Sequence, residues 1–72
     1  LMYQMKQGNY IYILDENGQV NGIYKKEDEA LKHNLWGKED NAEIQKGIKD
    51  LQAFVQDYMD RVMHHKLDPN KN

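Results

Sequence analysis

The last third of the chain carries an apolar stripe at helical spacing, and this stripe limits the possible folds more than any other feature. Its members recur at alternating intervals of four and three residues, which is the heptad repeat of a helix that packs along one seam. Asp40 to Glu43 has the form of a capping box with Asp40 as the N-cap, so the pattern predicts a helix over residues 41–66. The stripe consists of Ile44, Ile48, Leu51, Val55, Tyr58, Val62 and His65, flanked by Phe54, Met59 and Met63.

The expected helix is longer than the remainder of a 72-residue chain can cover. At about 1.5 Å per residue, residues 41–66 extend about 39 Å, whereas a compact chain of this length is roughly 29 Å across. We therefore expect the first turns to pack on the chain's own sheet and the later turns to pack on a second copy. The predicted oligomer interface comprises Leu51, Val55, Tyr58, Met59, Val62 and His65.

Two glycine-containing turns predict an antiparallel sheet in the first third of the chain. Gly8-Asn9 suits a two-residue type II′ loop, in which the first residue has a positive φ. Asp15 favours a type I turn, and Gly18 can then form a G1 bulge. The strands are expected over about residues 2–7, 10–15 and 19–25.

The bulged loop also sets the expected pairing of the second and third strands: Leu14 opposite Val20, Tyr12 opposite Gly22, and Ile11 opposite Ile23. Tyrosines and isoleucines then lie on different faces, and we expect the long helix to pack on the isoleucine face. The expected tyrosine face comprises Tyr10, Tyr12, Leu14, Val20 and Tyr24, and the isoleucine face comprises Ile11, Ile13 and Ile23.

Residues 27–35, between the sheet and the long helix, are predicted to form a short helix that begins with acidic residues. Gly37 fits the left-handed position that ends a helix, and Trp36 is expected in the core or at a ligand site. The predicted fold class is α+β, with a hairpin or three-stranded meander, a short helix and a long C-terminal amphipathic helix. We expect one domain over residues 1–66 and a disordered tail over residues 67–72.

The composition excludes several classes of function. The chain contains no Ser, Thr or Cys, which rules out those nucleophiles and also disulfide bonds. Ten Lys and Arg residues against 12 Asp and Glu residues give a net charge of −2 without a basic stripe, so duplex nucleic acid is an unlikely partner. The longest uncharged apolar run, Tyr10 to Leu14, is far too short to span a membrane. We expect a cytoplasmic protein in a bacterial host cell, with no membrane partner.

Residues with metal-binding or acid–base chemistry occur in two settings. His64 and His65 lie near Asp57 and Asp60, but ion pairs along the helix and the helix dipole explain them without a metal. The acidic groups at residues 15–16, 27–29 and 39–40 fall in turns or near helix starts, where acids are favoured for local reasons. We therefore predict no catalytic, metal or cofactor site, no cofactor and no enzymatic activity.

Aromatic residues supply the candidate sites for a partner or ligand: Tyr10, Tyr12, Tyr24 and Trp36. One alternative function is a small-molecule or nucleotide-binding module, with a pocket at the subunit interface that uses Tyr24, Trp36 or Tyr58. A second alternative is single-stranded nucleic-acid binding through the tyrosine face, because bases stack on such side chains.

The segment Tyr10–His33 resembles small phage-encoded accessory proteins in which a hairpin leads into a helix whose Ala packs on the sheet. The residues that carry the resemblance are Tyr10-Ile11-Tyr12-Ile13-Leu14, Asp15-x-x-Gly18, Val20-x-Gly22-Ile23-Tyr24 and Glu29-Ala30-Leu31. The resemblance implies an inhibitor of a host or defence protein, such as a CRISPR effector. The expected function is therefore a non-enzymatic homo-oligomeric interaction protein that binds itself and another protein.

Overall fold

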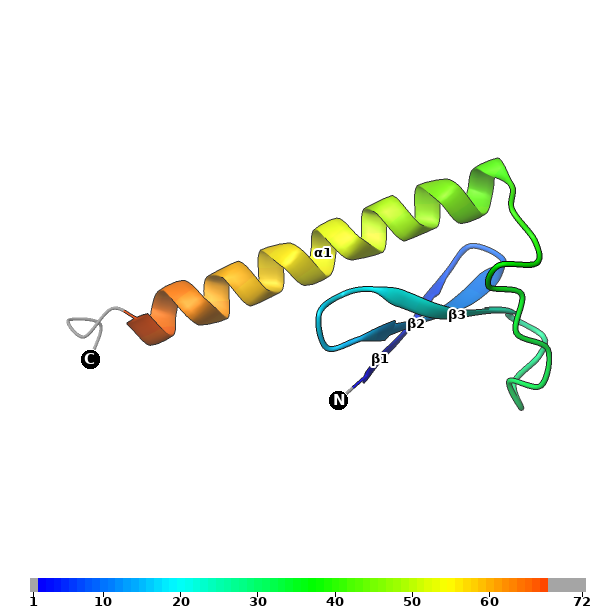
Figure 1. Ribbon diagram of the computed structural model, residues 1–72, viewed down its shortest axis with the longest axis horizontal. Helices are drawn as coiled ribbons and strands as arrows, with labels where there is room; N and C mark the ends of the chain where they lie inside the picture. The colour runs from blue at the N-terminus through cyan, green and yellow to red at the C-terminus, as the bar shows by residue number, and fades with distance from the viewer. Residues whose placement is uncertain (1, 68–72) are drawn as a thin grey trace.

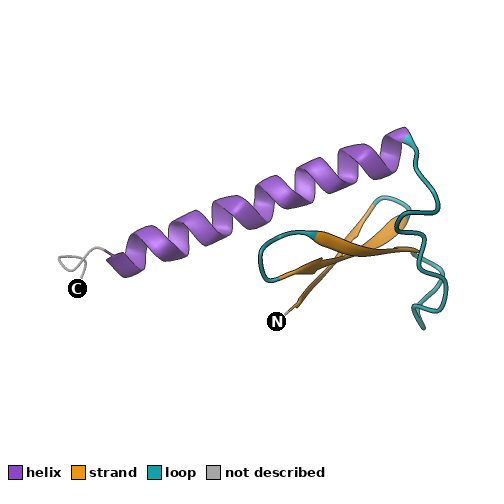
Figure 2. Cartoon of the chain, in the orientation of Figure 1, coloured by secondary structure: helices purple, strands orange, loops and turns teal. Residues whose placement is uncertain are grey.

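The computed structural model describes residues 2–67 as a three-stranded antiparallel sheet followed by one long helix (Figures 1 and 2). The strands β1 (Met2–Gln7), β2 (Tyr10–Asp15) and β3 (Val20–Lys25) are neighbours in that order, and the helix is α1 (Ala42–Leu67). The predicted α+β class is confirmed. The helix extends one residue beyond the predicted boundary, and residues 68–72 of the predicted tail lie outside the described residues.

Both predicted turns are present, and glycine supplies the positive φ in each. Gln7 pairs with Tyr10, so Gly8-Asn9 is a two-residue loop, and Gly8 has a φ of 59°. In the second turn the Gly18 N–H donates to the Asp15 carbonyl oxygen at 2.9 Å, and Gly18 has a φ of 81°. These positions favour glycine because a Cβ is unfavourable in the left-handed region.

A bulge between β2 and β3 changes the expected register. Leu14 pairs with Val20 as predicted, but Ile13 pairs with Gly22, which leaves Asn21 as an extra residue. The pairings predicted further along are wrong, since Tyr12 lies opposite Ile23 and Ile11 lies opposite Tyr24. Because side chains alternate along a strand, the extra residue exchanges the faces of Ile23 and Tyr24.

The long helix packs on the tyrosine face of the sheet, and the prediction that it covers the isoleucine face is wrong. With Ile23 added by the bulge, this face is the more continuous apolar surface, and burying it against α1 removes more apolar area from water. On the opposite face the Tyr24 ring lies across Gly22, 3.0 Å from where a Cβ would be. The buried core consists of Tyr10, Tyr12, Leu14, Val20, Ile23, Ile44, Leu51 and Val55.

The segment between β3 and α1 is a loop, so the predicted short helix over residues 27–35 is wrong. The Asp28 carboxylate accepts hydrogen bonds from the backbone N–H groups of Lys32 at 3.1 Å and His33 at 2.9 Å. A side chain that binds these amides competes with the helical hydrogen bonds they would otherwise make. Leu31 has a φ of 55°, which is also incompatible with a right-handed helix.

The N-cap of α1 is Asn41, and the predicted Asp40 cap is wrong. The Asn41 Oδ1 atom accepts a hydrogen bond from the Ile44 N–H at 2.8 Å, and its Nδ2 atom donates to the Tyr10 hydroxyl at 2.9 Å. An amide can accept from the helix and donate to the sheet at once, which a carboxylate cannot. The Asp40 carboxylate instead accepts from the Gln45 side chain at 3.1 Å.

Helix and sheet approach each other closely where Tyr12 meets Gly47. A Cβ on Gly47 would overlap the Tyr12 hydroxyl and ring. The Tyr12 side chain is 0% exposed, and its hydroxyl has no hydrogen-bond partner among the described residues. Burial, with a smaller contribution from the Glu43 charge, raises the pKa of Tyr12. A glycine that weakens the helix at this point therefore allows α1 to reach the sheet.

The helix extends well beyond the sheet (Figure 1). Its 26 residues span about 39 Å, whereas the six residues of each strand span about 20 Å. The molecule measures 47 × 24 × 18 Å, and its radius of gyration of 14.6 Å exceeds the roughly 11 Å of a compact chain of this length. Met59 is the last helix residue that packs against the core among the described side chains, so the turns of α1 beyond it lie past the sheet.

Replacing Gly47 with Ala tests the contact between α1 and Tyr12. In an isolated helix this change would be favourable by about 1 kcal/mol, but here the new methyl group displaces the Tyr12 ring. We expect G47A to destabilise the protein by about 1–3 kcal/mol in urea denaturation. Adding Tyr12→Phe, which removes the unpaired hydroxyl, should recover part of the loss. A stabilised G47A variant would contradict this packing.

Candidate functional site

From Phe54 onward, α1 carries large apolar side chains in contact with solvent. Phe54, Tyr58, Val62 and Met63 are each between 44% and 60% exposed, and we refer to these four residues as the distal patch. On the helix surface, residues four apart are neighbours, so Phe54, Tyr58 and Val62 form a continuous row. Contiguous exposed apolar surface on a small protein is typical of a binding site.

A groove connects the distal patch to the end of the sheet. It has a volume of about 320 Å³ and lies between α1, the start of β1 and the turn between β2 and β3. Met59 and Tyr3 are half-buried at its floor and pack against the edge of the core. The groove is lined by Tyr3, Glu16, Asn17, Tyr58, Met59, Val62 and Met63.

The residues of the predicted oligomer interface lie in two different environments. Leu51 and Val55 are only 8% and 1% exposed because they pack beneath α1 in the core of the chain itself, so assigning them to an intermolecular interface is wrong. Tyr58 and Val62 are exposed and Met59 is half-buried. The His65 side chain lies outside the described residues. Phe54 and Met63 were expected only to flank the apolar stripe, yet both are exposed. Their large apolar side chains and their positions beside the stripe were the sequence features that could have placed them on this surface.

The predicted tyrosine platform does not exist on this sheet. Tyr10 and Tyr12 are buried beneath α1 with their rings edge to face, 6.2 Å apart between centroids. The Tyr10 hydroxyl accepts from Asn41 and donates to Glu39 at 3.3 Å. Tyr24 lies half-buried on the opposite face, so the three rings cannot stack on one nucleic-acid strand.

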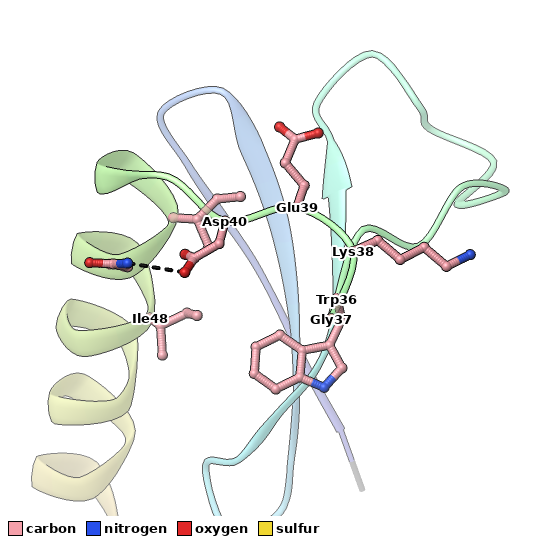
Figure 3. Close-up of a pocket in the computed structure, with 8 residues that line it drawn as sticks. Trp36, Gly37, Lys38, Glu39, Asp40 and Ile48 are labelled. Carbon is pink, nitrogen blue, oxygen red and sulfur yellow. Dashed lines mark hydrogen bonds between the residues drawn. The ribbon is translucent and has the colours of Figure 1, made fainter.

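Trp36 lies at the rim of a second hollow and is 47% exposed rather than in the core. The hollow has a volume of about 470 Å³ and separates the loop before α1 from the first turns of the helix. Figure 3 shows the indole beside Ile48 and the Asp40 side chain turned toward α1. Gly37 has a φ of 81°, the left-handed conformation that was predicted, although it ends no helix.

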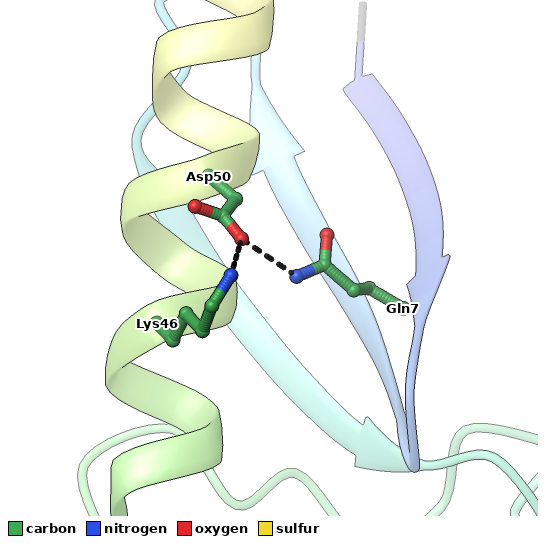
Figure 4. A network of polar contacts seen from close by, with 3 residues as sticks. All are labelled: Gln7, Lys46 and Asp50. Carbon is green, nitrogen blue, oxygen red and sulfur yellow. Dashed lines mark hydrogen bonds and ion pairs between the residues drawn. The ribbon is translucent and has the colours of Figure 1, made fainter.

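Two acidic side chains of α1, Glu43 and Asp50, form hydrogen bonds with the first hairpin. The Glu43 carboxylate accepts hydrogen bonds from Asn9, at 2.7 Å from the backbone N–H and 3.0 Å from Nδ2, and these bonds lower the pKa of Glu43. Asp50 accepts from Lys46 at 2.6 Å and from Gln7 at 3.2 Å, as Figure 4 shows. The Lys46 hydrogen bond is the main reason that the pKa of Asp50 is lowered. Both carboxylates therefore link α1 to the first hairpin in ionised form.

The residues with metal-binding chemistry are dispersed. In the part of the chain that the structure describes, no three His, Asp or Glu side chains approach a common point. Asp57 forms the predicted ion pair with Arg61 at 2.9 Å, and Asp60 accepts from Gln56 at 3.1 Å. The side chains of His64 and His65 lie outside the described residues.

No family model matches the chain, and no curated protein or solved structure is significantly similar to it. No helix within residues 2–67 combines the length and apolar character needed to cross a membrane.

The Glu43 contact gives the protein an acid-sensitive component of stability. Since the pKa of Glu43 is lower in the folded chain than its ordinary value of 4.5, the contact stabilises the fold above pH 4.5. That stabilisation is lost as the pH falls through the lower, folded pKa. We expect Glu43→Gln to reduce the free energy of unfolding at pH 7 and to flatten its decline between about pH 5 and pH 3. Denaturation at several pH values measures this.

Glu29→Gln provides a matched control, because Glu29 is an exposed glutamate in the loop before α1. The control should retain the pH dependence of the unmodified protein. An equal flattening in both variants would contradict a specific role for the Glu43–Asn9 contact.

Proposed function

We propose that this protein is a non-enzymatic interaction protein that acts as a homo-oligomer through the projecting half of α1. The observation that carries the proposal is the distal patch, four large apolar side chains that remain exposed on α1 from Phe54 onward. A second copy is the partner that is always present at the same concentration, and symmetric dimers are the commonest closed assemblies.

The chemistry of the distal patch suits a protein partner. Aromatic side chains and methionine are enriched in protein interfaces, and the patch contains both. Charged residues lie beside it, including the Asp57–Arg61 pair, which can rearrange to form contacts between chains. The small net charge of −2 gives little repulsion between copies.

A heterologous target forms the second part of the proposal. The hairpin over residues 10–24 resembles that of small phage-encoded accessory proteins, which favours a host or defence protein, such as a CRISPR effector, as the target; the helical part of the resemblance is not shared, because residues 27–35 form a loop. An oligomer would present each binding surface more than once and would gain affinity by avidity.

Sedimentation equilibrium tests self-association through the distal patch. The unmodified protein should form oligomers at micromolar concentration, and the double variant Tyr58→Lys/Val62→Lys should weaken association at least about 10-fold, because it places two charges in the apolar surface. Ala53→Lys adds a charge at an exposed position on the opposite side of α1 and should leave association unchanged. A monomer at about 100 μM, or a double variant that associates normally, would overturn the proposal.

The hollow beside Trp36 favours a second candidate function, the binding of a small planar ligand. Its volume of about 470 Å³ falls within the range of small-molecule sites, and Ile44, Ile48 and the indole give it apolar walls. The Asp40 carboxylate at its rim favours a neutral or cationic ligand over one that carries phosphate.

Intrinsic fluorescence measures ligand binding directly, because Trp36 is the only tryptophan in the chain. Titration with adenosine should change the emission in a saturable way, and ATP should bind more weakly. Ile48→Lys, which fills the hollow, should abolish the response. An unchanged emission, or an equal response in the Ile48→Lys variant, would exclude this function.

A further inference from the structure

The geometry points to a specific mode of self-association: the open edge of β1 pairs antiparallel with β1 of a second copy, so that the two sheets become one continuous sheet. This inference rests on the proposed function, since it specifies how two copies of the chain meet. The two sheet edges, the side chains of β1 and the side of α1 that faces β1 all favour this pairing.

The edge formed by β3 is already occupied by the chain itself. The Ile23 N–H donates to the Asn34 Oδ1 atom at 3.1 Å, and the Ile23 carbonyl oxygen accepts from the Leu35 N–H at 2.7 Å. The Asn21 carbonyl oxygen accepts from the Asn34 Nδ2 atom at 3.3 Å. A second copy therefore cannot pair along β3 without displacing this segment.

The edge formed by β1 is open. Because Gln7 and Tyr10 close a two-residue loop, the backbone groups of Gln7, Met5 and Tyr3 point toward β2. Those of Met2, Gln4 and Lys6 alternate with them and point away from the sheet. No backbone group elsewhere in residues 2–67 pairs with these outward groups. The strand also lacks proline and bulges, which protect many edges from pairing, and Lys6 is its only charged residue.

The sequence of β1 is complementary to itself in one antiparallel register. A twofold axis at Gln4 places Met2 opposite the partner's Lys6 and Gln4 opposite the partner's Gln4, so the outward backbone groups of both strands are paired. The one charged residue of the strand then faces a methionine. A twofold axis at Lys6 would instead place like charges opposite each other and shorten the overlap.

The same register buries apolar side chains on the face that carries α1. Tyr3 lies opposite the partner's Met5, and both side chains are half-buried in the single chain. Direct cross-strand pairs bring Cβ atoms within about 5 Å, close enough for the methionine sulfur to contact the ring. The twofold axis generates a second, equivalent pair, so the contact between Tyr3 and Met5 is made twice.

The helix adds apolar surface above this edge. The Asp50 carboxylate accepts a hydrogen bond from Gln7 of β1, which places the Asp50 side of α1 toward the open edge (Figure 4). Phe54 and Tyr58 follow at intervals of four residues and so lie on that same side. A strand added to β1 would pass beneath them, and part of the distal patch would become buried against the partner.

A single cysteine tests this register, because the natural chain contains none. In the proposed pairing the two Gln4 Cα atoms lie about 5.5 Å apart, within the range that a disulfide spans. Gln4→Cys should therefore convert largely to a covalent dimer when diamide is added. Two thiols form one S–S bond and release two protons, and the diamide takes up the electrons.

Lys6→Cys is the matched control. Two Lys6 positions lie roughly 14 Å apart along the paired strands, too far for a disulfide. This variant should remain largely monomeric under denaturing electrophoresis, whereas a mixture of Met2→Cys and Lys6→Cys proteins should form the mixed dimer.

Sedimentation of the unmodified protein separates the two hypotheses. If it associates but Gln4→Cys stays reduced, or if Gln4→Cys and Lys6→Cys form disulfides equally well, the β1 pairing is overturned and the proposed function stands. A protein that remains monomeric throughout overturns both.

Discussion

The close contact between Tyr12 and Gly47 is the constraint on which the rest of the structure depends. A glycine in the second turn of α1 lets the helix lie directly on the tyrosine ring, which places Ile44, Leu51 and Val55 over the remaining core residues. The Asn41 cap and the Glu43–Asn9 contact hold the start of the helix at the first hairpin turn. Once this end is held, the length of α1 determines that its later turns extend beyond the sheet.

This extension and the open β1 edge belong to the same surface. The loop after β3 closes one edge of the sheet, and no corresponding segment among the described residues pairs with the outer edge of β1. The exposed row of Phe54 and Tyr58 lies on the side of α1 that faces the open edge. An isolated three-stranded sheet with one helix buries little apolar area, so covering this surface with a second copy would add substantially to stability.

The sequence was sufficient where the signals are local. Gly8 and Gly18 predicted both turns, the alternation of residues predicted the strands to within one residue, and the apolar stripe predicted α1. It was insufficient where distant contacts decide the outcome. The bulge at Asn21 reverses the faces of Ile23 and Tyr24, and Gly22 was the only local sign of it. Residues 27–35 follow the hydrogen bonds of Asp28 rather than their helical preference. Of the six residues predicted at a partner surface, Tyr58 and Val62 are exposed, whereas Leu51 and Val55 pack in the chain's own core.

Hydrogen exchange at two protein concentrations tests most directly whether a second copy covers this surface. The amides of α1 over residues 45–51 should be protected at both concentrations, because they are hydrogen-bonded within the helix and lie over the sheet. The amides over residues 56–63 and the outward amides of Gln4 and Lys6 should exchange rapidly in dilute solution and become protected as the concentration rises through the dissociation constant. Exchange at these positions that does not change with concentration, in a protein that sediments as an oligomer at the higher one, would contradict the account.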